Sequence, residues 1–202
     1  MTDKAELRDL LRRARRVSQQ ASDAPGRADR ADRIARAVLA QPEVADRLSA
    51  RPAPAVAVYA SLQFEPPTDA LRRRLREAGH RVLLPVAEPD GRLGWVIDHG
   101  AEATAWGVSS ADPAIGHPPV VGFGARLLID EQVAVLLLPA LAATVAGDRL
   151  GQGGGYYDRL LAELPGVAGG GPLRVCLVGT DELLDELPKE SHDEPVDVVV
   201  TA

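Results

Sequence analysis

Apolar side chains recur at helical spacing through the N-terminal part of the chain. Between residues 3 and 18 they fall every three or four positions, and the opposite face is nearly all arginine. A proline–glycine pair interrupts this pattern, after which helices are predicted over about 27–40 and from Pro42 to about Leu48. The pattern therefore predicts a helical segment over about residues 1–50.

Beyond this segment, short apolar runs alternate with helical spacing. Runs rich in β-formers predict five strands, at 55–62, 80–87, 133–141, 174–179 and 196–201. Helices are predicted at 70–78 and 156–164, and residues 88–131 are typical of loops with short antiparallel strands. Apolar strands that alternate with helices indicate an α/β fold: a mostly parallel central sheet of about five or more strands, with helices on both faces.

Length and composition narrow the class of protein. The 202 residues suit a single domain over 1–202 with the helical segment packed on it, and 46% hydrophobic and 26% charged residues are in the globular range. A net charge of -6 and only 3% aromatic residues argue against a nucleic-acid partner. No apolar stretch reaches the roughly eighteen residues that a membrane span needs.

The expected compartment is the cytoplasm. The N-terminus is charged at once and lacks the apolar core of a signal peptide. The single cysteine, Cys176, lies in an apolar run, so it supports neither a disulfide framework nor a cysteine zinc site, and it is expected to be buried and inert. The four histidines fit no metal-ligand spacing.

The stretch GDRLGQGGGYYDRLL at residues 147–161 has the chemistry of an anion site. It lies between a predicted buried strand and a predicted helix, where open parallel sheets bind ligands. Its glycines would let backbone N–H groups approach an anion, and Arg149 adds a planar cation suited to phosphate. Because it matches neither the P-loop nor the dinucleotide fingerprint, a phosphate cradle, a tight turn and a linker all remain open.

Asp158 stands in the first turn of the helix predicted after the glycines. A carboxylate there favours the helix dipole, yet it would repel a bound phosphate unless a divalent cation bridged the two. From the residues alone, Asp158 is therefore either a charge at the helix start or a magnesium ligand.

At these residues the sequence resembles the 5-formyltetrahydrofolate cyclo-ligase family, also called methenyltetrahydrofolate synthetase. The family's signature resembles RLGxGxGYYDR, and residues 149–159 read RLGQGGGYYDR. The N-terminal KAELR, the segment FEPPT after the first strand and the tail LPKESHDEPVDVVVT resemble three further family elements. These pieces follow one another in the family's order along the whole chain.

The resemblance implies a Rossmann-like α/β fold and a reaction. 5-Formyltetrahydrofolate and ATP would give 5,10-methenyltetrahydrofolate, ADP and phosphate, with magnesium. The formyl oxygen would attack the γ-phosphate, N10 would close on the activated carbon, and phosphate would leave. Because phosphoryl transfer needs positioning and charge neutralisation more than a covalent protein group, the lack of a nucleophile motif is expected.

The resemblance also implies roles for individual residues. Lys4 and Arg8 would contact the ATP phosphates, Glu65 would accept two N–H bonds from the pterin, and Asp158 and Asp193 would hold Mg²⁺. The loop that would bind ATP comprises Arg149, Leu150, Gly151, Gln152, Gly153, Gly154, Gly155, Tyr156 and Tyr157. Its catalytic members would be Arg149 and Tyr157, and its members bordering the folate would be Gln152, Gly153, Gly154, Gly155 and Tyr156.

Some positions depart from the family's pattern or stay open. Ala143 and Thr144 stand where family members often carry an aspartate, and the uncharged Gln152 offers no cationic contact. One of the two tyrosines is expected to pack inward while the other faces the ligand. Trp106 is expected either in the folate pocket or in the core, and the other arginines of the first helix are expected in solvent.

Two alternatives to a folate cyclo-ligase remain. One is a non-catalytic nucleotide- or folate-binding protein that kept the loop. The other, a sugar-phosphate isomerase or CoA transferase on a similar fold, has no motif in its favour. The joint presence of the basic residues, the glutamate and both aspartates favours catalysis. The partners would be the two small-molecule substrates, with no nucleic acid or membrane, and the chain would be a monomer or a weak homodimer.

Overall fold

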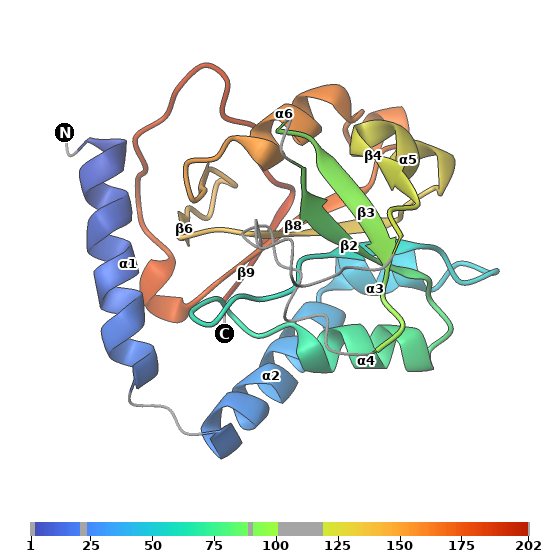
Figure 1. Ribbon diagram of the computed structural model, residues 1–202, viewed down its shortest axis with the longest axis horizontal. Coiled ribbons are helices and arrows are strands. Elements are labelled where there is room, and N and C mark those ends of the chain that lie inside the picture. Colours follow the sequence, from blue (N-terminus) through green and yellow to red (C-terminus); the bar gives the residue numbers. More distant parts are fainter. Residues whose placement is uncertain (1–2, 21–23, 89–90, 101–118, 202) are drawn as a thin grey trace.

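The computed structural model describes residues 3–20, 24–88, 91–100 and 119–201 (Figure 1). Its main sheet consists of β1 (Val56–Val58), β2 (Val82–Ala87), β3 (Leu93–Ile97), β4 (Gly122–Phe123), β5 (Val135–Pro139), β8 (Leu173–Val178) and β9 (Val198–Thr201). The seven strands lie in the order β4-β3-β2-β1-β5-β8-β9, and β2, β1, β5, β8 and β9 run parallel. The prediction of a mostly parallel α/β sheet is confirmed.

Helices cover both faces of this sheet, as the strand pattern predicts. The helices α2 (Ala24–Leu39), α3 (Pro42–Leu48) and α4 (Asp69–Glu77) pack on one face, and α5 (Gly124–Asp130) and α6 (Tyr156–Glu163) on the other (Figure 1). Successive strand residues alternate between the two cores: Val56 and Val58 face the first, and Ala57 faces the second. This burial on both faces explains why the central strands β1 and β5 are apolar along their whole length.

Residues 88–131 hold both antiparallel strands, β3 and β4, and the helix α5, for which the sequence pattern gave no prediction. The expectation of short antiparallel strands there is confirmed. Cys176 is fully buried in β8, and burial raises the pKa of its thiol to about 12, which agrees with a packing role. None of the described helices combines the length and the apolarity needed to cross a membrane.

The first helix, α1 (Lys4–Gln20), stands apart from the other five (Figure 1). Its apolar residues Leu7 and Leu11 pack on a small cluster that includes Leu141 and Leu150, next to a two-stranded hairpin of β6 (Ala142–Ala143) and β7 (Arg149–Leu150). This hairpin follows the carboxyl end of β5. The helix therefore lies at the edge of the sheet where open α/β folds bind ligands.

Candidate active site

A cavity of about 450 Å³ lies between α1, the loop that follows β1, the glycine-rich loop and the C-terminal segment. Such a volume is typical of small-molecule sites. Every site residue named from the sequence lines it: Lys4, Arg8, Glu65, Arg149, Leu150, Gly151, Gln152, Gly153, Gly154, Gly155, Tyr156, Tyr157, Asp158 and Asp193. Four segments that are distant in sequence thus meet at one site. Trp106 lies outside the described residues.

The glycine-rich loop is a tight connection from β7 into α6. Gly153 has a φ of +99°, and Gly155, at the start of α6, has a φ of +66°. L-residues rarely adopt these conformations, so glycine is required there. A Cβ on Gly154 would also stand 2.9 Å from the ring of Tyr156. These constraints exclude the flexible-linker interpretation.

Two arginines of α1 hold this loop by its backbone. Arg8 Nε donates to the carbonyl oxygen of Gly151 at 3.0 Å, and Arg12 Nη2 donates to that of Gln152 at 2.7 Å. Arg12 Nε also donates to the side-chain oxygen of Gln152 at 3.2 Å. Because the arginines bind carbonyl oxygens of the loop, these bonds do not use the backbone N–H groups of the loop. The expectation that Arg12 lies in solvent is wrong, since it helps to shape the loop.

Arg15 also contradicts the expectation that the remaining arginines face solvent. Its side chain is only 5% exposed and donates to both carboxylate oxygens of Glu182, at 2.6 and 2.7 Å, and to the carbonyl oxygen of Ala140 at 2.6 Å. The reason is visible in the helix: Arg15 lies four residues after Leu11, on the buried face. Glu182, beyond the end of β8, supplies the counter-charge that the sequence gave no sign of.

Arg149 and Asp158 form an ion pair on the cavity wall, between Nη2 and Oδ1. The Arg149 side chain is almost fully buried, and its Nε atom has no hydrogen-bond partner among the described residues. The guanidinium lies over the ring of Tyr157, 6.0 Å from its centroid. A buried guanidinium held on one side and unpaired on the other is suited to receive an anion.

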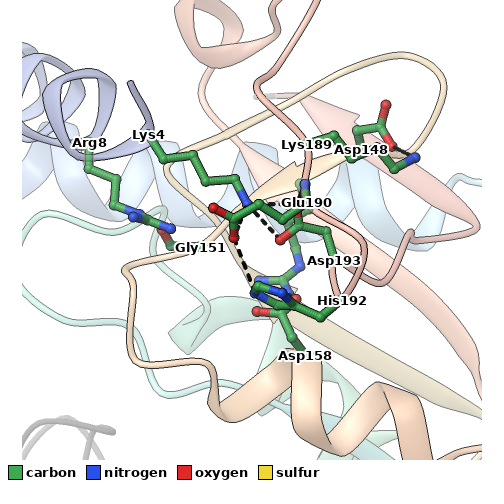
Figure 2. A network of polar contacts seen from close by, with 10 residues as sticks. Lys4, Arg8, Asp148, Gly151, Asp158, Lys189, Glu190, His192 and Asp193 are labelled. Carbon is green, nitrogen blue, oxygen red and sulfur yellow. Dashed lines mark hydrogen bonds and ion pairs between the residues drawn. The ribbon is translucent and has the colours of Figure 1, made fainter. Parts of the chain in front are cut away.

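A second ion pair joins α1 to the C-terminal segment. Lys4 Nζ lies 2.9 and 2.6 Å from the two carboxylate oxygens of Asp193 and 3.0 Å from Oε2 of Glu190 (Figure 2). Partial burial opposes ionisation of Asp193, but hydrogen bonds from Lys4 and from the Glu190 backbone outweigh it and hold the carboxyl pKa below its ordinary value. The pKa of Lys4 is raised, because the same partners outweigh its desolvation.

Side chains that could bind a metal ion lie around the ion pair of Lys4 and Asp193. Glu190, His192 and Asp193 each offer a ligand atom, and these atoms lie within 4.8 Å of one another. Asp158 does not belong to that group, but it lines the same cavity. The sequence indicated the two aspartates but not Glu190 or His192. Glu190 and His192 both lie within three residues before Asp193 in the tail motif.

Glu65 lies in the loop between β1 and α4 and is 6% exposed. Its Oε2 accepts a hydrogen bond from the backbone N–H of Leu62 at 3.0 Å. Burial raises the pKa of Glu65, although the Leu62 N–H, the charge of Arg15 and the side chain of Gln152 act against the rise. A buried carboxylate on a cavity wall, close to a guanidinium, is suited to bind N–H donors of a ligand.

The two tyrosines differ in burial. Tyr157 is 7% exposed and packs in the core, whereas Tyr156 is only partly buried and lies under the guanidinium of Arg159, 5.3 Å from its ring centroid. Both line the cavity. The hydroxyl of Tyr157 is buried and has no hydrogen-bond partner among the described residues.

Ala143 and Thr144, at the position where an aspartate was missing, are both buried in the hairpin that precedes the glycine-rich loop. The hydroxyl of Thr144 accepts a hydrogen bond from the backbone N–H of Asp148 at 3.1 Å. Neither residue lines the cavity. Their role here is therefore to shape the turn rather than to contact a ligand.

Comparisons with known proteins place the chain among relatives of one family. The sequence profile of the 5-formyltetrahydrofolate cyclo-ligase family matches residues 1–202. A 5-formyltetrahydrofolate cyclo-ligase from Mycolicibacterium smegmatis is 36% identical over 151 residues, which are 72% of this chain and 72% of the relative. Another, from Escherichia coli K12, is 32% identical over 149 residues, which are 72% of this chain and 76% of the relative.

Two solved structures share the fold. A 5,10-methenyltetrahydrofolate synthetase from Mycoplasma pneumoniae superposes with a TM-score of 0.66 over 98% of both chains at 18% identity. The synthetase from Aquifex aeolicus gives a TM-score of 0.64 over 96% of this chain and 89% of its own, at 22% identity. At such identities the likeness shows the fold alone. On the strength of the full-length profile match and the two relatives, the chain belongs to the 5-formyltetrahydrofolate cyclo-ligase family.

Proposed function

We propose that this cyclo-ligase binds ATP and 5-formyltetrahydrofolate together in the cavity and activates the formyl group by phosphorylation. The observation that carries the proposal is the composition of this one cavity, whose wall combines basic side chains, an anion-binding loop and a buried carboxylate. A phosphate-rich nucleotide and an amino-pterin need these two kinds of contact. A protein that bound only one of the two ligands would have no use for the other set.

The phosphates of ATP would lie against Lys4, Arg8 and the glycine-rich loop. The loop's N–H groups and the start of α6 supply partial positive charge, and Arg149 supplies a buried guanidinium. Because Arg8 and Arg12 hold the loop by its carbonyl oxygens, the loop would be ordered before the nucleotide arrives. Positioning of this kind is the main contribution that a protein makes to phosphoryl transfer.

The residues also fit a magnesium ion. Asp158 and Asp193 are hard oxygen ligands on the wall of the cavity proposed for the triphosphate, and magnesium favours carboxylates together with phosphate oxygens. Bound there, Mg²⁺ would neutralise charge on the phosphates. Each aspartate is paired with a basic residue, Asp158 with Arg149 and Asp193 with Lys4. Those cations would become free for the phosphates when the carboxylates take a metal.

Glu65 would hold the pterin by accepting two N–H bonds from its aminopyrimidine edge. With both substrates in place, the formyl oxygen attacks the γ-phosphorus and ADP leaves. N10 then attacks the formyl carbon, loses its proton, and the C–O bond breaks to release phosphate and the methenyl product. Arg149 would stabilise the charge on the transferred phosphoryl group, and the Tyr157 hydroxyl would donate to a ligand oxygen.

A direct assay tests the proposal. Purified protein is mixed with 5-formyltetrahydrofolate, ATP and Mg²⁺, while the near-ultraviolet absorbance of the methenyl product and the release of ADP are followed. We expect equal amounts of product and ADP, and no ADP release when the folate is omitted. A protein that binds both ligands without forming product would instead be the non-catalytic binder, and folate-independent release of phosphate would indicate a different reaction.

A further inference from the structure

Arg15 has one donor that the protein does not use. Its Nε and Nη2 atoms are committed to Glu182 and to the carbonyl oxygen of Ala140. Its remaining nitrogen, Nη1, is buried and has no hydrogen-bond partner among the described residues. Because a buried, unpaired guanidinium N–H costs free energy, the position calls for an acceptor that a ligand could supply.

Arg15 and Glu65 line the same cavity. Desolvation lowers the pKa of Arg15, but the hydrogen bond and charge of Glu182, with a smaller contribution from the charge of Glu65, outweigh it and raise the pKa. The guanidinium of Arg15 in turn opposes the rise that burial causes in the pKa of Glu65. The hydroxyl of Tyr59 donates to the carbonyl oxygen of Pro66 at 2.8 Å and does not accept from the free nitrogen, which has no partner among the described residues. The wall thus presents an acceptor with an unused donor near it.

This pair complements one edge of a pterin. The edge carries an exocyclic amine, a ring N–H and a carbonyl oxygen side by side, which is the order donor, donor, acceptor. A carboxylate can accept from the first two groups, and the carbonyl oxygen then needs a donor beside it. We propose that Arg15 is a specificity-determining residue that donates from Nη1 to the pterin carbonyl oxygen while Glu65 accepts the two adjacent N–H bonds.

This inference rests on the proposed function, because it assumes that Glu65 binds the pterin. It adds that α1, which carries the residues proposed to bind phosphate, also contacts the pterin of the folate. Since Glu182 fixes the guanidinium by two of its nitrogens, the direction of the third is set before the substrate binds. Lysine has no such fork and would not reproduce the contact.

Folic acid and aminopterin are suitable probes, because aminopterin carries an amino group in place of the pterin carbonyl and therefore also lacks the hydrogen on the adjacent ring nitrogen. The effect of a variant is compared between the two ligands, so that a difference in their wild-type affinities does not enter the result. The dissociation constants of both are measured for the full chain by calorimetry or by competition with 5-formyltetrahydrofolate. We expect Arg15→Met to weaken folic acid by about ten-fold or more, in keeping with a hydrogen bond from a charged donor. Aminopterin should be affected far less, so the ratio of the dissociation constant of folic acid to that of aminopterin should rise.

Two further variants separate recognition from docking of the helix. Glu182→Gln loosens the same helix but keeps the Arg15 donor, so it should weaken both ligands alike and preserve the ratio. Arg13→Met, at an exposed position of α1 outside the cavity lining, should change neither constant. An Arg15→Met ratio equal to that of the wild type overturns the inference. A wild type that turns over neither substrate overturns the proposed function instead, and the inference falls with it.

Discussion

Lys4 and Asp193, 189 residues apart in the sequence, form an ion pair in which Nζ lies 2.6 Å from Oδ2 (Figure 2). Arg149 and Asp158 form a second pair in the same cavity. In both, a cation proposed to bind phosphate is held by a carboxylate proposed to bind magnesium. The site without ligands is therefore neutralised internally, and binding of the nucleotide with its metal would exchange the partners of all four groups.

If the four groups exchange partners in this way, Lys4→Met should change the affinity for a divalent metal ion in the absence of nucleotide. Removing the ammonium frees Asp193 and Glu190 of their competing cation, so Mn²⁺, followed by electron paramagnetic resonance, should bind more tightly than to the wild type. The KM for ATP should rise by about ten-fold, since a charge-assisted phosphate contact is lost.

Lys189→Met is the matched control for this variant. Lys189 pairs with Asp148 at 2.6 Å in the same way, but neither residue lines the cavity. Both Mn²⁺ binding and the KM for ATP should stay at their wild-type values in the control. If Mn²⁺ bound equally to the wild type and to Lys4→Met, Lys4 would not compete with a metal.

Asp193→Asn should impair magnesium-dependent turnover far more than folding. The neutral amide is a poor magnesium ligand, while Lys4 keeps its ion pair with Glu190, so the helix remains docked. We expect kcat/KM to fall by about 100-fold at a fixed magnesium concentration, with only a small change in melting temperature. Asp158→Asn should behave alike in turnover. Asp148→Asn serves as the control, and equal activity of all three variants would remove the two aspartates from the metal site.

Glu65 predicts the pH dependence of folate binding. The carboxylate must be ionised to accept two N–H bonds, and burial raises its pKa, so protonation occurs at a higher pH than for an exposed glutamate. Affinity for 5-formyltetrahydrofolate should therefore be full at neutral pH and be lost as the pH falls through the raised pKa, above the ordinary value of 4.5. Calorimetric titrations at a series of pH values measure this profile.

The variant Glu65→Gln shows whether titration of Glu65 causes the pH dependence of folate affinity. The variant should bind weakly, with no loss of affinity in that pH range beyond what the ligand's own groups cause. A wild-type profile that stays flat until the pH is below 4.5, or a profile that Glu65→Gln shares, would place the titrating group elsewhere.

Gly155→Ala should strain the entry to α6. The φ of +66° disfavours any side chain, and a Cβ would stand 2.7 Å from Nη1 of Arg159. We expect a loss of about 1–2 kcal/mol in the free energy of unfolding, measured by urea denaturation, together with a higher KM for ATP. Gly166→Ala is the counterpart, because its φ is -68° and no atom would meet the new Cβ. Its stability should stay within about 0.5 kcal/mol of the wild type, and equal losses in both variants would count against backbone strain.

Much of the architecture could be predicted because strands and helices leave local periodic patterns. The five parallel strands and the helices at 70–78 and 156–164 follow from apolar spacing alone. The helix α5 could not, since it lies in a stretch rich in turn-forming residues and no capping side chain marks its start, whereas the equally short α3 begins at Pro42. Short elements depend on tertiary packing more than on their own propensity.

The site was predictable where a motif marks it and not where the fold creates it. The residues of the glycine-rich loop, with Lys4, Arg8, Glu65 and Asp193, all reach the cavity that the motifs implied. The burial of Arg15 depends on Glu182, a residue 167 positions away, and no local pattern records such a partner. The same holds for the ion pair of Asp193 with Lys4, which arises only when the two ends of the chain meet.

The central claim is that the formyl oxygen accepts the γ-phosphoryl group of ATP within this cavity. Its most direct test uses 5-formyltetrahydrofolate carrying ¹⁸O in the formyl group, with mass-spectrometric analysis of the phosphate released during turnover. The account predicts that each phosphate contains one ¹⁸O atom, transferred when the C–O bond breaks. Product formation with unlabelled phosphate would contradict it, because ATP would then be hydrolysed without activating the formyl oxygen.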